Sequence, residues 1–436
     1  MIISRRHFLA AGSAAFSISL LGRASAQDKA LKPLRVATVF PSATGQSVIK
    51  ASINDYIGDA GRMGAELADN LVGGPASQQG VQLKVLLANA PTVEAAIRAG
   101  ERLVETEDIH ALIGGIGAGQ AEVLASIAEK AGIPFFNVGE TADAFRGASC
   151  GRHTFHVEAS DAMYLDALAN LSMAQNYGRW FVVHEDSESG TALLQRAKIA
   201  LTRAGAGEVV GAASVPTGKL LYTDEIAAAG SSGADVVVLL LDDADQIAFL
   251  SQQEQASLKL ASLTLPRTLT QTRDYIAAAR YRAPTTNPTH RIALWETTMT
   301  GNGAGDFNDR FRAQYGEPAD PTAWSAYHAI KIITDTVQAI GTTEPDAVIA
   351  YLENPDTTFD LLKGPGVSFR PWDHQLRQPL YAIKVDQESQ WSRSSLDSRI
   401  GIAAFDAEVP VLAGDDDPRE RLDTLGDDAS TLACKF

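Results

Sequence analysis

The sequence predicts an α/β fold made of two doubly wound, Rossmann-like lobes, and three observations support this. Short β-branched apolar runs alternate with longer helical patterns from Leu34 onward, which is typical of a parallel sheet covered by helices. The alternation restarts near Trp180 with a second series. The chain has 436 residues, 45% of them hydrophobic, whereas a single core rarely grows beyond about 250 to 300 residues. Two lobes are therefore expected.

The first series alternates strands with helices in an order that favours one parallel, doubly wound sheet. Strands are expected at 34–40, 81–87, 111–113 and 134–138, and helices at 61–72, 92–104 and 120–131. Gly73-Gly74-Pro75 is expected to stop the first of these helices, and Thr92 is placed to cap the second.

The second series predicts strands at 181–183, 236–241 and 260–263 and helices at 192–204 and 323–338. The run 236–241 is almost wholly apolar, as a strand buried on both faces must be. Asp320 is placed to cap the last helix, and Pro321 falls in its first turn. Strands are also expected at 367–369 and 380–385. After them, 386–436 turns polar and acidic and is expected to form an irregular wrap.

The N-terminal segment 1–26 is predicted to be a twin-arginine signal peptide. Arg5 and Arg6 precede the apolar run 10–21, and Ala24-Ser25-Ala26 provides a cleavage site. The apolar run is too short to span a bilayer, so the mature chain is expected in the periplasm without membrane insertion. An uncleaved membrane anchor is the alternative.

Removal of this segment takes away three arginines and no acidic residue, so the net charge would change from −16 to −19. Such a surface repels nucleic acid and anionic lipid headgroups, and we expect no nucleic-acid partner. Cys150 and Cys434 are the only cysteines. The expected compartment permits a disulfide, but two independent thiols remain the alternative, because a bridge needs Cα atoms within about 7 Å.

Motifs of catalysis are missing from the sequence. It contains no His-Glu-x-x-His, no paired Cys-x-x-Cys, no Gly-x-Ser-x-Gly elbow and no Walker loop, so we expect no enzyme, no cofactor and no metal. The glycine cluster 114–119 does not fit a dinucleotide motif, because Gln120 occupies its last position. Its turn offers free N–H groups to a polar ligand atom, or else it only lets a helix pack on a strand.

Ligands of doubly wound sheets bind outside the carboxyl ends of the strands, where five polar clusters occur in this sequence. A single cluster of this kind is commonly a solvated loop, but their joint position at successive strand ends favours a binding site. The candidate ligand-binding residues are Ala118, Gly119 and Gln120; Glu140 and Thr141; Ser187 and Ser189; Asp242 and Asp243; and Arg267, Trp295 and Glu296. An alternative is an enzyme that holds a hard cation between the acids Glu140, Glu185, Asp186, Asp242 and Asp243.

Several short runs carry a resemblance to a known family. They are Gly64–Ala68, Ile113-Gly114, 131–134 with 137–139, and Phe155–Asp161. In their order and spacing, 34–385 resembles the type I periplasmic binding proteins of ABC transporters, in particular the branched-chain amino acid and amide group. The resemblance implies two lobes, joined by three crossovers, that close on a small molecule and deliver it to a membrane permease. The implied lobes are 33–154 with 290–353 and 155–289 with 354–412, followed by an acidic tail at 413–436.

A narrower resemblance lies near the C-terminus. The run Ser368–Pro379, together with Leu422–Gly426 and Cys434, is similar to the subfamily associated with PQQ-dependent alcohol catabolism. It implies a transporter linked to periplasmic quinoprotein dehydrogenases and a disulfide between Cys150 and Cys434. Arg370, Trp372 and Arg377 are expected to lock the tail onto a lobe by stacking and bidentate pairing, rather than to contact ligand.

The departures from the family pattern concern the ligand. Amino-acid binders place a small hydroxyl residue where this chain has Ala118, and the Glu140 carboxylate would repel an amino acid's own carboxylate. Ser189 stands where an aromatic residue is usual, and Arg267 falls near the acid that pairs with the ligand ammonium. The cleft is therefore expected to prefer a polyol, an alcohol-derived product, a cation or a metal complex. An alternative function is a sensor or accessory protein that delivers a cofactor or metal to a quinoprotein dehydrogenase.

Overall fold

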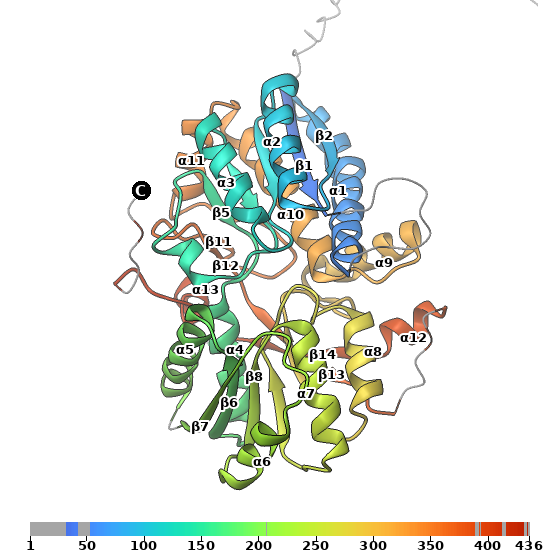
Figure 1. Cartoon of the computed structure of the whole chain (residues 1–436). Coiled ribbons are helices and arrows are strands. Elements are labelled where there is room, and N and C mark those ends of the chain that lie inside the picture. The colour runs from blue at the N-terminus through green and yellow to red at the C-terminus, as the bar shows by residue number, and fades with distance from the viewer. Residues whose placement is uncertain are drawn as a thin grey trace, which may run out of the picture. The chain divides into compact units, whose positions relative to one another are not determined.

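A computed structural model describes residues 32–41, 53–205, 207–388, 392, 394–411, 416–430 and 434 (Figure 1). The signal peptide predicted at 1–26 lies outside these residues. In the part of the chain that is described, none of the helices combines the length and the apolar character needed to cross a bilayer.

The first lobe is built on a five-stranded parallel sheet with the order β2-β1-β3-β4-β5. Its strands are β1 (Lys32–Phe40), β2 (Val81–Asn89), β3 (Ala111–Gly114), β4 (Phe135–Asn137) and β5 (Thr154–His156). Helices α1 (Ile53–Gln78), α2 (Val93–Glu107) and α3 (Gln120–Ala131) connect the first four strands. The predicted elements of this lobe are confirmed, including the Thr92 cap, whose Oγ1 accepts a hydrogen bond from Ala95 N at 3.2 Å.

Helix α1 is longer than the sequence predicts. It runs through Gly73-Gly74-Pro75, so the expected stop is wrong. The physical reason is packing: α1 lies beside α10 (Pro321–Ile340), and Ala76 is fully buried beyond the proline (Figure 1). Burial of one helix face outweighs the single backbone hydrogen bond that Pro75 removes.

The second lobe contains a four-stranded parallel sheet with the order β7-β6-β8-β9. Its strands are β6 (Arg179–Glu185), β7 (Glu208–Val215), β8 (Val236–Leu240) and β9 (Ala261–Thr264), and its helices are α4 (Asp161–Ala174), α5 (Glu188–Ala204), α6 (Thr223–Ser231), α7 (Asp243–Gln255) and α8 (Arg273–Arg282). Strand β8 is buried along its whole length, as its apolar sequence predicts. A three-stranded antiparallel ladder of β10 (His290–Ala293), β13 (Leu380–Val385) and β14 (Ala403–Val409) completes the lobe.

Between β10 and β13 the chain returns to the first lobe. This part contains the 3-10 turn η2 (Gly301–Gly303), α9 (Ala304–Tyr315), α10, α11 (Pro345–Glu353) and the hairpin of β11 (Ser368–Phe369) and β12 (Leu376–Arg377). Gln375 forms a parallel bridge with His156, so the hairpin extends the first sheet beyond β5. The chain thus crosses between the lobes three times: after β5, after β10 and after β12.

Some strand pairings differ from the expected lobe boundaries. Strand β10 was expected in the first lobe and pairs with β13, whereas the β11–β12 hairpin was expected in the second and adjoins β5. Strands of two to four residues carry too little pattern to show which sheet they join. The segment 386–436 is also more regular than expected, because it contains β14, α12 (Leu396–Ile400) and α13 (Pro418–Leu422).

Asp320 stands at the N-cap of α10, but its side chain makes no capping hydrogen bond. Burial raises its pKa to about 7, partly offset by Arg273. The predicted position of this residue is confirmed, and its predicted capping bond is wrong.

Candidate functional site

The glycine turn after β3 forms the first wall of the candidate site. Gly115, Gly117 and Gly119 have positive φ angles, and Gly119 occupies the N-cap position of α3. A Cβ on Gly115 would lie 2.6 Å from Asn137 Oδ1, so only glycine fits there. Ala118 is exposed at the tip of this turn. Gln120, in contrast, is buried and donates from Nε2 to Ala90 O at 3.0 Å, which gives it a structural role in place of the expected ligand contact.

The turn after β4 is organised by Asn137. Its Oδ1 accepts from Glu140 N at 2.9 Å, and its Nδ2 donates to Glu140 O at 2.7 Å. The Glu140 carboxylate accepts from Ala142 N at 2.8 Å, so the side chain is held beside the turn. Thr141 is buried next to it.

In the second lobe, the ends of β6 and β8 bring acidic groups together. Glu185 Oε1 accepts from Asp242 N at 3.1 Å, and burial, with Asp242 as the next cause, raises the Glu185 pKa. The pKa of Asp243 is also raised, by burial first and Asp242 second. Asp242 occupies the N-cap position of α7 without a side-chain capping bond.

The serines after β6 have a local role. Ser187 Oγ caps α5 by accepting from Gly190 N at 3.0 Å, and the Oγ atoms of Ser187 and Ser189 lie 3.1 Å apart. Ser189 is exposed. One of these two hydroxyls therefore serves the helix start, while the other borders solvent.

Arg267 joins the two lobes at the centre of this arrangement. Its Nη1 donates to Thr141 Oγ1 at 3.1 Å and to Asp161 Oδ1 at 2.9 Å. The neighbouring Thr268 Oγ1 donates to Gly139 O at 3.1 Å. Two consecutive residues after β9 therefore hold the turn after β4 and the start of α4, which fixes the carboxyl ends of both parallel sheets against each other.

The electrostatics around Arg267 are strongly acidic. Burial opposes its charge, but the carboxylates of Asp161, Glu140, Glu185 and Asp242 outweigh this cost and raise the Arg267 pKa. One guanidinium thus faces acids from both lobes. Such a site donates few hydrogen bonds and accepts many, so it suits a ligand rich in hydroxyl or ammonium donors.

Two acidic residues of this region were missed by the sequence analysis. Asp161 begins α4, and Asp143 Oδ1 accepts from Ala162 N at 2.9 Å within the same helix start. Burial, followed by the charge of Asp161, raises the Asp143 pKa to about 7. An acid in the first turn of a helix is common, so the sequence alone gave no signal that distinguishes a site residue from a helix-dipole partner.

Trp295 and Glu296 lie in the packed interior. The Trp295 ring stacks on Trp324 at 5.6 Å, and its indole donates to Asn308 Oδ1 at 3.1 Å. Glu296 pairs with buried Arg273. Because core contacts occupy both side chains, we correct their expected ligand contact to a structural role. Within the described ranges, no three His, Cys, Asp or Glu side chains are placed to hold a metal ion.

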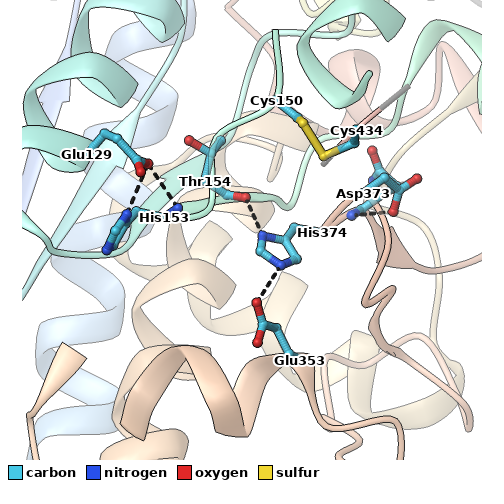
Figure 2. The surroundings of a disulfide bond; sticks show 9 residues. Glu129, Cys150, His153, Thr154, Glu353, Asp373, His374 and Cys434 are labelled. Atoms are coloured by element: carbon cyan, nitrogen blue, oxygen red, sulfur yellow. Dashed lines mark hydrogen bonds and ion pairs between the residues drawn. A yellow bond between two sulfur atoms is a disulfide. The ribbon is translucent and has the colours of Figure 1, made fainter. Parts of the chain in front are cut away.

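The predicted disulfide is confirmed. Figure 2 shows the bond between Cys150 and Cys434, whose Cα atoms lie 5.7 Å apart. It stands close to His374, which stacks on Phe155 at 4.3 Å and whose Nε2 lies 3.1 Å from a Glu353 carboxylate oxygen (Figure 2). The disulfide therefore attaches the last described residue to the first lobe, just before β5.

The expected lock of the tail is confirmed as well. Arg370 Nε and Arg377 Nε both donate to Asp423 Oδ1 at 2.8 Å, and Arg377 Nε also donates to Oδ2 at 2.9 Å. The two guanidinium groups lie over the Trp372 ring at 5.7 and 5.0 Å. These side chains hold the tail on the β11–β12 hairpin.

Comparison with known proteins identifies the family. A sequence model described as "Periplasmic binding protein" matches residues 52–390. The chain belongs to the periplasmic binding protein family. "Leu/Ile/Val-binding protein homolog 7" of Brucella melitensis biotype 1 is 23% identical over 356 residues, covering 78% of this chain and 84% of that protein.

Solved structures of periplasmic binding proteins share the fold. A branched-chain amino acid ABC transporter periplasmic ligand-binding protein from Burkholderia xenovorans LB400 has a TM-score of 0.72 at 19% identity, covering 87% of this chain and 95% of that one. A solute-binding protein of an ABC transporter from R. palustris, in complex with benzoate, has a TM-score of 0.67 at 19% identity. The match covers 93% of this chain and 100% of that one. These relatives are binding proteins and not enzymes, which agrees with the expectation that this periplasmic binding protein is non-catalytic.

Proposed function

We propose that this chain is the periplasmic solute-binding component of an ABC transporter, which captures a small polar molecule between its lobes and delivers it to a membrane permease. The observation that carries the proposal is the meeting of both sheets at Arg267 and Thr268 of the second lobe, which bond across to Thr141 and Gly139 of the first lobe, while Asp161 at the start of α4 holds Arg267 in place. Contacts of this kind link lobe closure to a site between the lobes. The family match and the relatives from ABC transporters support it.

The proposal includes the route and the biological setting expected from the sequence. Residues 1–26 would direct twin-arginine export to the periplasm, and the subfamily resemblance of the run 368–379 supports a link to PQQ-dependent alcohol oxidation. In this proposal the ligand contacts come from the strand-end residues that border the acidic centre: Ala118, Gly119, Glu140, Thr141, Ser189, Asp242, Asp243 and Arg267.

The ligand that this site supports best is a neutral polyol or a cationic molecule. Carboxylates from both lobes accept hydrogen bonds from hydroxyl or ammonium groups, while a ligand carboxylate would face Glu140, Glu185 and Asp242 with only Arg267 to offset them. The names of the relatives span amino acids and benzoate, so the fold itself does not dictate one chemistry.

A thermal-shift screen followed by calorimetry tests this function. Polyols, diamines, alcohol-derived acids, metal salts and branched-chain amino acids are compared on the mature protein. We expect polyols or diamines to raise the melting temperature, and leucine, isoleucine and valine to bind with dissociation constants no tighter than the millimolar range. Micromolar leucine binding would contradict the assignment of Ala118 and Glu140 to the ligand site. Stabilisation by metal salts alone would favour the accessory role over solute capture.

A further inference from the structure

The C-terminal residues 419–427 contact both lobes alternately. Arg419 pairs with Asp356 at 3.8 Å and donates to Pro355 O, both after α11 of the first lobe. Arg421 Nη1 donates to Glu408 Oε1 at 3.0 Å and to Pro410 O at 2.6 Å, at the end of β14 in the second lobe.

The next residues repeat this alternation. Asp423 is held by Arg370 and Arg377 of the first-lobe hairpin, and Arg370 Nη2 also donates to Leu425 O at 2.5 Å. Three residues later, Gly426 N donates to Asp166 Oδ2 of α4 at 2.8 Å, within the second lobe.

A cluster on α4 and α5 completes the second-lobe anchor. Arg203 donates to Gly426 O at 2.8 Å and to Thr424 O at 3.1 Å, and Arg196 Nε donates to Asp427 Oδ1 at 3.0 Å. Arg196 also forms a bidentate pair with Asp166, with bonds of 2.9 and 2.6 Å.

The middle of this segment is buried, whereas Arg419 and Arg203 are each 38% exposed. Leu422 and Leu425 are fully buried, and the Arg370 and Asp166 side chains are 1% and 3% exposed. Gly426 has φ +89°, and a Cβ there would lie 3.0 Å from both Arg370 Nη1 and Met163 Cγ. The segment therefore fits closely between a hairpin of one lobe and a helix of the other. Breaking one side of a buried, charge-paired contact of this kind is costly.

We propose that residues 419–427 are an interlobe brace: a segment that spans the crossovers and limits how far the two lobes separate when no ligand is bound. Near its end, at Gly426, the brace contacts α4, whose first residue, Asp161, holds Arg267 in the ligand site. It thus sets the range of the movement that opens that site. The significance of this movement for ligand capture rests on the proposed function, but the brace itself is a property of the ligand-free protein.

Two substitutions weaken the brace, one on its first-lobe contacts and one on its second-lobe contacts. Asp423→Ala removes the bonds from Arg370 Nε and Arg377 in the first lobe, and Arg203→Ala removes the bonds to Gly426 O and Thr424 O in the second lobe. Matched controls lie within one lobe. Asp335→Ala breaks a pair with Lys331 inside α10, and Arg179→Ala breaks a pair with Glu208 between neighbouring strands.

Small-angle scattering of the ligand-free proteins, combined with hydrogen exchange, measures the effect. We expect both brace variants to have a larger radius of gyration than the wild type, and the double variant to exceed each single variant, because each single variant keeps one anchor whole and part of the other. Hydrogen exchange should increase at the crossover 157–160 as well as in 419–427. Both controls should match the wild type.

Further measurements distinguish loss of the brace from a failure to fold and from an error in the proposed function. Far-UV circular dichroism and a cooperative thermal transition establish that each variant is folded. If Asp423→Ala does not fold, Asp423→Asn keeps the side-chain shape and weakens the same anchor. The proposal would be contradicted if the folded variants had an unchanged radius of gyration and faster hydrogen exchange only in residues 419–430. A larger radius in a protein that binds none of the screened solutes would retain the brace and reject the proposed function.

Discussion

The two lobes touch on two sides, and the contacts on these sides differ in kind. On the ligand side, Arg267 is 28% exposed and makes one hydrogen bond across the lobes, to Thr141, and Thr268 adds a second, to Gly139. On the tail side, buried arginines hold Asp423 and the carbonyl groups of the brace. Both sides use partly buried charges, with Arg267 28% and Asp423 29% exposed, but on the tail side two arginines that are 1% and 6% exposed depend on one carboxylate. Leaving such a buried charge without its partner costs several kcal/mol. The comparison indicates that the ligand side separates readily and the tail side stays joined.

The largest expected effect comes from removing the centre of the tail side. In Asp166→Ala, Arg196 and Arg203 lose their carboxylate and Gly426 N loses its acceptor. Because the change leaves buried Arg196 with Asp427 as its remaining carboxylate partner, we expect the free energy of unfolding to fall by about 3 kcal/mol, the lower end of the range for a broken buried pair. Urea unfolding followed by circular dichroism measures this loss.

Asp335→Ala is the matched control for that measurement. It breaks an i,i+4 pair with Lys331 inside one helix, so we expect a loss of about 0.5 kcal/mol or less. Similar losses in Asp166→Ala and Asp335→Ala would contradict the distinction between the two contact sides.

The second-largest expected effect concerns the pH dependence of stability and comes from Glu158, in the first crossover between the lobes. Glu158 is fully buried, with Oε1 accepting from Tyr164 Oη at 2.6 Å, and burial raises its pKa from 4.5 to about 7. The folded state therefore binds this proton more tightly than the unfolded state. The resulting stabilisation is complete below pH 4.5, is lost as the pH rises towards 7 and stays absent above it.

Glu158→Gln removes this titration. The stability of the variant relative to the wild type should therefore rise by about 2 to 3 kcal/mol between pH 5 and pH 8, measured by urea unfolding at both values. Glu353→Gln is the control, because its hydrogen bond with His374 lowers the Glu353 pKa below 4.5, outside this window. If the free energies of unfolding of Glu158→Gln and wild type differed by the same amount at pH 5 and pH 8, Glu158 would not be the source of the pH dependence.

The third effect tests the ligand side. Asp242→Ala and Glu140→Ala remove acceptors next to Arg267 from opposite lobes. If these carboxylates meet polar groups of the ligand, each change should weaken binding by more than about 1.5 kcal/mol, the usual scale of a charged hydrogen bond. Calorimetry with the polyol or diamine that gives the largest thermal shift measures this. Unchanged affinity in both variants would remove the two residues from the site.

Much of the order of elements was predictable from the sequence, because most parallel strands are short apolar runs followed by an amphipathic helix. The strands β5 and β7 and the helices α4, α6, α7 and α8 were not predicted. Helix α3 and strand β13 match their predictions to the residue. Helix α1 was not predictable, since its continuation through Pro75 depends on packing against α10, nearly 250 residues away in the sequence. Tertiary contacts override local stop signals in such cases.

The candidate site was predictable in part for the same reason. Glu140, Thr141, Asp242 and Arg267 stand at strand ends, so the fold brings them together. Trp295 also follows a strand, but its strand joins an antiparallel ladder and its side chain enters the core. Asp161 was missed because only the folded chain brings it to Arg267, which lies more than a hundred residues later in the sequence.

The smallest effect concerns the disulfide, which attaches the tail beyond the brace. A chain-entropy estimate for a loop of nearly 300 residues gives roughly 5 kcal/mol, but it assumes that the cut tail becomes free. Here the buried ion pairs of Asp423 and Asp427 already hold the tail, so Cys434→Ser should lower the free energy of unfolding by only about 1 kcal/mol. Mass spectrometry of non-reduced wild-type protein should show the Cys150–Cys434 peptide and no free thiol. In the Asp423→Ala variant, Cys434→Ser should lower the free energy of unfolding by more, because the disulfide is then the main contact that holds the tail on the first lobe. Equal costs in the two backgrounds would mean that the bridge and the brace act independently.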